Sequence, residues 1–140
     1  MRSFVTSGDI PIGYVTPKFP SLFWPINNKK YTLSYLYYVT DIWKYTVYWT
    51  LILFLTFYVA AGLWASFSHR KTAGGVWIMV VYFVAGGFQA IAAGTVAGLL
   101  LAVTYKAGLF AMSTWIPLCI SVVLILFHVS TTYSMAGCII

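Results

Sequence analysis

Residues that could support acid–base or metal chemistry are few and widely separated in this sequence. Asp9 and Asp41 are its only acidic residues, and it contains no glutamate. Carboxylate-pair hydrolysis and hard-metal binding both need several carboxylates at one site, so neither is indicated. Cys119 and Cys138 show no zinc-ligand spacing and belong to no nucleophile–base pair. We therefore expect no catalytic site, no cofactor and no bound metal, and predict that the chain is not an enzyme.

His128 is the one ionisable side chain that lies deep within an apolar stretch. An ionisable group inside a membrane is a functional candidate by default. Ser130, Thr131 and Thr132 follow it and indicate a polar patch near the membrane exit. Two interpretations stay open: a neutral histidine that packs and hydrogen-bonds inside the protein, or a functional intramembrane polar site.

Membrane-spanning helices must position these residues. Of the 140 residues, 61% are hydrophobic and only 7% are charged, which lies well outside the range of soluble globular proteins. Three apolar stretches meet the length of about 20 residues that a bilayer-crossing helix needs. The sequence predicts an all-α integral membrane protein: an extramembrane or interfacial segment (1–43), then a transmembrane domain (44–140) with spans at about 45–67, 76–103 and 115–135.

The second span carries the strongest pattern. Small residues recur at every fourth position along one face: Gly86, Ala90, Gly94, Gly98 and Ala102. The neighbouring row holds Ala85, Gln89, Ala93 and Ala97. Small residues let helix backbones approach closely in lipid. This face either seats the first and third helices of the same chain or receives a foreign helix or a lipid chain, and we expect Gln89 to hydrogen-bond a neighbouring helix. Because the span is longer than the bilayer core is thick, it must tilt, protrude or break, with Gly86-Gly87 as the place for a bend.

Aromatic residues crowd the segment before the first span, which also contains four prolines and is too short to close a core. One interpretation is an aromatic belt at the level of the lipid headgroups. The other is a docking arm for a protein partner. The candidate docking residues are Phe19, Phe23, Trp24, Tyr31 and Tyr35.

The net charge of +6 does not indicate nucleic-acid binding, because the basic residues flank apolar runs and form no stripe. Arg70, Lys71 and Lys106 are predicted to lie at the membrane interface, in reach of lipid headgroups. Three spans put Lys106 on the N-terminal side with Lys29, Lys30 and Lys44, and leave Arg70 and Lys71 on the other. The excess of positive charge therefore predicts a cytosolic N-terminus.

Several short motifs resemble the transmembrane protein 170 family. The run Phe57-Tyr58-Val59-Ala60-Ala61-Gly62-Leu63 leads to Arg70-Lys71, and Ala93-Gly94 is followed by Val103-Thr104-Tyr105-Lys106-Ala107-Gly108. The resemblance covers roughly residues 43–135 and departs at Gln89-Ala90, where a Gly-Pro pair is expected. It implies a small, non-enzymatic, three-span protein of the endoplasmic reticulum and nuclear envelope, linked to the shape of reticulum sheets and tubules.

The leading hypothesis is a non-catalytic membrane adaptor, a subunit of a larger endomembrane complex. It would dock a large membrane-protein partner through the small-residue face or the aromatic arm, and a lipid-transfer or membrane-contact-site assembly is the kind of complex considered. One alternative is direct shaping of the reticulum membrane by a wedge-like bundle. Another is a small homo-oligomeric transporter or channel with Gln89 and His128 along its path. The predicted location is the endoplasmic reticulum membrane, with other endomembranes such as the vacuole left open.

Overall fold

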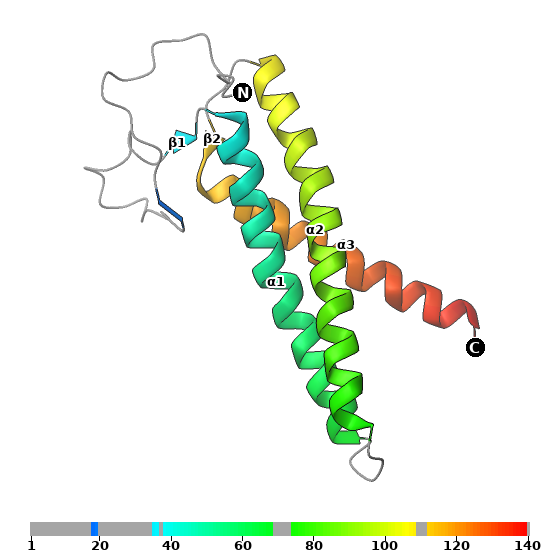
Figure 1. The fold of residues 1–140 in the computed structure, drawn as a ribbon. Coiled ribbons are helices and arrows are strands. Elements are labelled where there is room, and N and C mark those ends of the chain that lie inside the picture. The colour runs from blue at the N-terminus through cyan, green and yellow to red at the C-terminus, as the bar shows by residue number, and fades with distance from the viewer. Residues whose placement is uncertain (1–17, 20–34, 37, 69–73, 109–111, 140) are drawn as a thin grey trace, which may run out of the picture.

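Three long helices form the body of the protein (Figure 1). The structure is a computed structural model, and it describes residues 18–19, 35–36, 38–68, 74–108 and 112–139. The helices are α1 (Val39–Ser68), α2 (Gly75–Gly108) and α3 (Trp115–Ile139). Each is long and apolar enough to cross a membrane, in α3 over Trp115–Met135. The predicted all-α architecture with three spans is confirmed.

All three helices are longer than the predicted spans. The backbone amides of Asp41 and Ile42 both donate to the carbonyl of Tyr38, which starts α1 at Val39 rather than near residue 45. Residues 39–43, which the sequence placed in the N-terminal segment, are therefore helical. An acidic residue in the first turn also favours this helix start through the helix dipole.

Helix α2 runs without a break through Gly86 and Gly87. Its 34 residues make it about 51 Å long at 1.5 Å per residue. The hydrocarbon core of a bilayer is about 30 Å thick. A helix longer than the hydrocarbon core could break, tilt or protrude. Because α2 does not break at Gly86-Gly87, it has to tilt within the bilayer or protrude from it.

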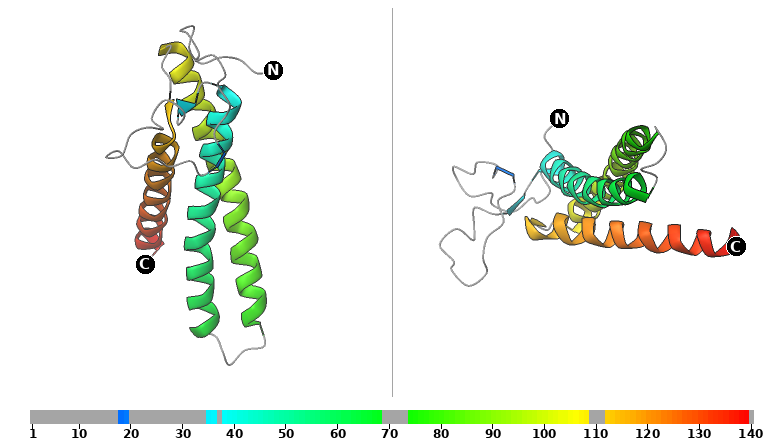
Figure 2. Two further views of the ribbon diagram at one scale, coloured as in Figure 1. Left: turned by 90° about the vertical axis from the view of Figure 1, so that its left-hand side faces the viewer. Right: turned by 90° about the horizontal axis from the view of Figure 1, so that it is seen from below.

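Helices α1 and α2 form an antiparallel hairpin, and α3 crosses it (Figures 1 and 2). The hairpin partners stay side by side over most of their length. Helix α3 starts beside the N-terminal end of α1, packs mainly on α1, and then diverges, so that its C-terminal half stands away from α2. The bundle is therefore closed at one end and splayed at the other.

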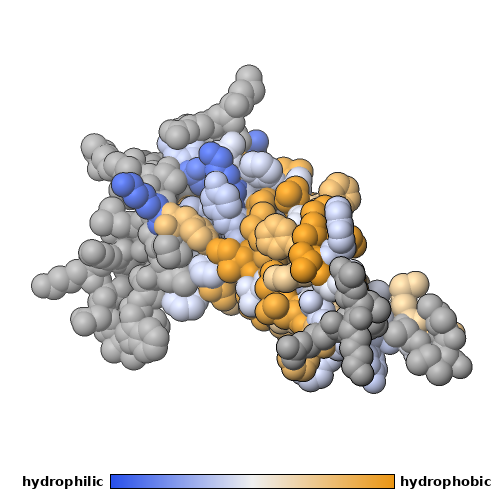
Figure 3. All heavy atoms as spheres, turned by 60° about the horizontal axis from the view of Figure 1, so that its bottom comes forward, coloured by the Kyte–Doolittle hydropathy of each residue, from blue (hydrophilic) through white to orange (hydrophobic). Residues whose placement is uncertain are grey.

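Most large apolar side chains face outward, as expected where lipid is the solvent. Trp64, Phe88 and Phe127 expose 81%, 77% and 69% of their surfaces. Figure 3 shows apolar residues spread over the helices, with hydrophilic residues gathered to one side. The buried core is thin and consists of two clusters: Leu36, Ile42, Tyr45, Ala102 and Met112 at the closed end, and Phe54, Ala90 and Ile125 midway.

A pair of two-residue strands closes the N-terminal end of the bundle. β1 (Tyr35–Leu36) pairs antiparallel with β2 (Met112–Ser113), with Tyr35 opposite Ser113 and Leu36 opposite Met112. The side chains of Leu36 and Met112 are fully buried. The strand pair thus ties the segment before α1 to the connection between α2 and α3. We call it the β clip.

Candidate functional site

The small-residue face of α2 lies against α1. Gly86, Ala90, Gly94, Gly98 and Ala102 are the buried residues of α2. A Cβ atom added to Gly94 would lie 3.2 Å from both the Cβ of Thr50 and the Cα of Val47. One added to Gly98 would lie 3.2 Å from the Trp43 ring. Backbone-to-backbone approach of this kind is what small residues provide in lipid. The structure therefore places a helix of the same chain on this face and leaves it no open side for a foreign helix.

The opposing row on α1 has the same spacing of four. Its members are Ile42, Thr46, Thr50, Phe54, Tyr58 and Gly62, and all but Tyr58 are buried. They face Ala102, Gly98, Gly94, Ala90, Gly86 and Tyr82 in that order. A large side chain on one helix faces a glycine on the other: Tyr58 of α1 fills the space over Gly86, and Tyr82 of α2 packs against Gly62. We call these two interlocking rows the seam.

Thr50 connects the seam to α3. Its hydroxyl lies 3.0 Å from the hydroxyl of Ser121 on α3 and also donates to the carbonyl of Thr46 at 2.7 Å. The Ser121 hydroxyl lies 2.8 Å from the carbonyl of Pro117 on its own helix. Both side chains are fully buried. A hydrogen bond between buried hydroxyls, one turn from the centre of the span, fixes where α3 crosses the hairpin.

The neighbouring small-residue row of α2 is only partly covered: Gln89, Ala93 and Ala97 are half-buried. Gln89 is half-buried in a shallow groove of about 400 Å³, open to the outside, which Leu124 of α3 closes on one side. The other lining residues are Ala92, Ala93, Val96, Ala97 and Leu100. Among the described residues, the Gln89 amide has no hydrogen-bond partner. The expected bond from Gln89 to a neighbouring helix is therefore not made within the described part of the chain.

His128 has a partner on α1. Its Nε2 lies 2.9 Å from the hydroxyl of Tyr58, and the Phe54 and His128 rings are 5.3 Å apart between centroids. The hydroxyl of Thr132 donates to the His128 carbonyl at 2.9 Å. Of the two interpretations of His128, the hydrogen-bonded one matches this geometry, although the imidazole is only half-buried.

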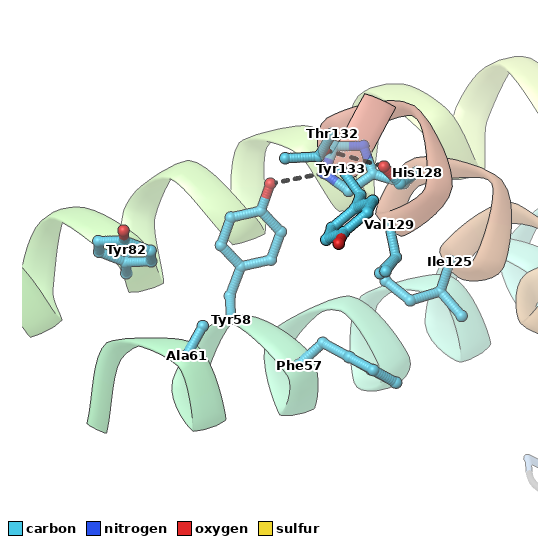
Figure 4. Close-up of a pocket in the computed structure, with 9 residues that line it drawn as sticks. All are labelled: Phe57, Tyr58, Ala61, Tyr82, Ile125, His128, Val129, Thr132 and Tyr133. Carbon is cyan, nitrogen blue, oxygen red and sulfur yellow. Dashed lines mark hydrogen bonds between the residues drawn. The ribbon is translucent and has the colours of Figure 1, made fainter. Parts of the chain in front are cut away.

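The Tyr58–His128 pair lies in a second cleft, where α3 diverges from the hairpin (Figure 4). This cleft has a volume of about 400 Å³. Figure 4 shows the Tyr58 side chain reaching from α1 across the opening to His128, while Tyr82 comes from α2. Its lining residues are Phe57, Tyr58, Ala61, Tyr82, Ile125, His128, Val129, Thr132 and Tyr133. We call it the tyrosine cleft.

The candidate docking arm is described only in part. The Phe19 ring packs against α1, with centroid distances of 5.5 Å to Tyr45, 5.5 Å to Tyr48 and 5.1 Å to Trp49. Tyr35 enters the β clip through its backbone. Phe23, Trp24 and Tyr31 lie outside the described residues. Phe19 is therefore an internal contact of the bundle.

Of the three basic residues predicted at the membrane interface, Lys106 is described. It is exposed in the last turn of α2, at the same end of the bundle as the exposed Lys44 at the start of α1. Arg70 and Lys71 lie outside the described residues.

The structure thus defines a small multi-pass membrane protein, whose three apolar helices bury a narrow seam and turn their large side chains to lipid. The sequence profile of the Transmembrane protein 170A/B-like family matches residues 35–138, and the chain belongs to this family. The predicted resemblance is confirmed. The matched region starts at β1 and covers α1, α2 and all but the last residue of α3.

A relative in Saccharomyces cerevisiae (strain ATCC 204508 / S288c), the "Uncharacterized protein YPR153W", is 61% identical over 137 residues. The alignment covers 98% of each chain. The similarity therefore extends beyond the family profile into the N-terminal segment. No solved structure matches the chain.

Sequence reasoning missed Tyr58, Thr50 and Ser121. The spacing of four from Thr46 to Gly62 was a usable signal, because it mirrors the spacing on α2. It escaped notice because this row mixes threonines and aromatic residues, whereas the α2 row is uniformly small. No sequence signal identifies Tyr58 as the partner of His128, since the two are 70 positions apart.

Proposed function

We propose that this protein is a non-catalytic membrane adaptor that docks a larger membrane-protein partner within the endomembrane system. The observation that carries the proposal is the Gln89 groove on α2. A primary amide without a hydrogen-bond partner is costly in hydrocarbon, where water cannot satisfy it. A transmembrane helix of a partner would supply both the missing bond and close packing against Ala93 and Ala97.

The sequence hypothesis placed the partner on the row from Gly86 to Ala102, whereas we now place it on the neighbouring row that contains Gln89. The row from Gly86 to Ala102 holds α1, so leucine at Gly94 or Gly98 would disrupt the protein's own hairpin. Loss of a partner from such variants would then say nothing about docking. The neighbouring row carries the Gln89 groove, and Gln89 and Ala97 can be altered there while Ala93, which packs against Phe54 and Ala90, is left unchanged.

Location and orientation belong to the same proposal. Family membership supports the endoplasmic reticulum membrane, and a lipid-transfer or membrane-contact-site assembly is the first kind of complex to test. The exposed Lys44 and Lys106 at the N-terminal end support a cytosolic N-terminus under the positive-inside rule.

The test is purification of the tagged full-length protein at native abundance in mild detergent, followed by native mass determination. We expect a large membrane protein at fixed stoichiometry with wild type. The double variant Gln89→Leu/Ala97→Leu should lose it while remaining membrane-inserted. Ala60→Leu, at an exposed alanine of α1 that lines neither cleft, is the matched control and should keep the partner. Retention by the double variant would refute docking at the groove, and a wild-type protein without a stoichiometric partner would refute the adaptor function.

One feature favours a second candidate, the direct shaping of the membrane. The divergence of α3 makes the bundle wider at the splayed end than at the closed end. A tapered bundle displaces unequal amounts of lipid in the two leaflets. This function predicts that purified protein tubulates or flattens liposomes without any partner, and unchanged liposomes at high protein density would exclude it.

A further inference from the structure

We propose that the tyrosine cleft is a binding site for a sterol, whose single hydroxyl hydrogen-bonds to the Tyr58–His128 pair. This site involves neither Gln89 nor its groove. An experiment that refutes the adaptor function therefore leaves the sterol site untested, and the reverse also holds.

The cleft has the form of a small-ligand site. Its volume of about 400 Å³ lies within the range of about 300–1,000 Å³ that is usual for ligand pockets. The lining is mainly apolar and contributed by all three helices, with the polar pair between its two walls. Such pockets typically combine an apolar wall with a few polar groups that fix the orientation of the ligand.

The polar pair suits one neutral hydroxyl. If Tyr58 donates to the imidazole, its oxygen still accepts a hydrogen bond. If the imidazole donates to Tyr58, the phenolic O–H remains free to donate. In either tautomer the phenol can therefore serve a ligand alcohol, which is itself both a donor and an acceptor.

Depth and charge exclude an ionic headgroup. Tyr58 lies ten residues from the end of α1, which is about 15 Å along the helix at 1.5 Å per residue. The lining residues include no lysine, arginine, aspartate or glutamate to balance a charge. An ion at this depth with no counter-charge beside it would be strongly unfavourable. The ligand must therefore be a neutral lipid.

The walls favour a rigid ligand. Phe57, Tyr82 and Tyr133 add aromatic rings to the lining of the cleft. A fused-ring lipid loses little conformational freedom on binding, whereas a flexible acyl chain has to be ordered. Among neutral lipids with one hydroxyl, a sterol combines the flat, rigid body with the alcohol that the pair recognises.

The experiment uses the full-length protein in phosphatidylcholine nanodiscs with a photoactivatable, alkyne-bearing cholesterol probe. We expect saturable labelling within residues 54–61 or 122–135, displaced by unlabelled cholesterol. Tyr58→Phe should raise the displacing concentration about tenfold, equivalent to about 1.4 kcal/mol. Tyr82→Phe, a tyrosine of the same cleft that makes no hydrogen bond to His128, is the matched control and should behave as wild type.

A second variant fills the cleft without removing the polar pair. Ala61 is exposed and lines the opening, so Ala61→Phe should abolish saturable labelling while the protein elutes from gel filtration as wild type does. Equal displacement curves for wild type and Tyr58→Phe would overturn the hydroxyl recognition. Labelling that does not saturate would overturn the site. Equal competition by diacylglycerol would overturn the choice of a sterol.

Discussion

The seam makes a sharp prediction for two adjacent glycines of α2. A Cβ added to Gly86 would lie 2.6 Å from the Cγ and 2.7 Å from the Cβ of Tyr58, whereas one added to Gly87 would meet no atom within 4 Å. Gly86→Ala should therefore destabilise the protein, and Gly87→Ala should not. Both substitutions make the same chemical change in the same helix, one position apart.

The magnitude follows from the overlap. Carbon atoms pack at about 3.5–4.0 Å, so the new methyl group intrudes by about 1 Å on the rigid base of an aromatic side chain. Overpacking of this kind costs about 1–3 kcal/mol in the free energy of unfolding. Alanine gains up to about 1 kcal/mol of helix propensity at either position, so this gain cancels in the comparison. The two variants should thus differ by about 1–3 kcal/mol, the cost of the overpacking alone.

The assay is equilibrium unfolding in mixed detergent micelles, followed by the fluorescence of the six tryptophans. Removing the whole Tyr58 side chain, including the Cβ at 2.7 Å, should relieve the overlap, so Tyr58→Gly and Gly86→Ala should couple favourably in a double-mutant cycle. Equal stability of the Gly86→Ala and Gly87→Ala proteins would refute the close contact between Gly86 and Tyr58. A clash that persists in the double variant would show that another residue occupies this space.

Three further predictions concern the Thr50–Ser121 hydrogen bond, the β clip and the membrane topology. Thr50→Val and Ser121→Ala should show a coupling of about 0.6 kcal/mol in a double-mutant cycle of unfolding, as is typical of hydrogen bonds between transmembrane helices; independent effects would contradict the Thr50–Ser121 bond. In a background without the natural cysteines, Leu36→Cys and Met112→Cys should form an intramolecular disulfide on mild oxidation, because opposed strand residues lie within disulfide range; failure would contradict the register of the β clip. In sealed microsomes, a membrane-impermeant maleimide should label Cys138 only after permeabilisation, and immediate labelling would reverse the proposed topology.

Much of the fold was predictable because lipid imposes simple requirements on a sequence. Length and apolarity located the three spans, and only the ends of the helices differ from the predicted bounds. The start of α1 depends on hydrogen bonds to the Tyr38 carbonyl, which hydropathy does not register. The spacing of four on α2 correctly marked a face for close packing. What it could not show was which helix occupies that face, because any smooth surface can accept many partners.

The contacts between residues far apart in the sequence could not be predicted from it. His128 was singled out for its chemistry, yet its partner Tyr58 reads as one more aromatic residue in an apolar run. The β clip involves only two residues on each side, too few for an alternating pattern to emerge. The Tyr58–His128 contact also depends on where α3 crosses the hairpin, and the buried hydrogen bond between Thr50 and Ser121 lies at that crossing.

The β clip also has a meaning for the order in which the protein matures. All partners in the seam lie between residues 42 and 102, so the contacts between its two rows can form before α3 is synthesised. β1 precedes the hairpin in the chain but pairs with residues 112–113, which follow it. β1 therefore has to wait until residues 112–113, which follow α2, have left the ribosome. Closure of the clip can therefore follow only after α2 is complete, and a chain arrested after α2 would carry a finished hairpin with an unpaired strand.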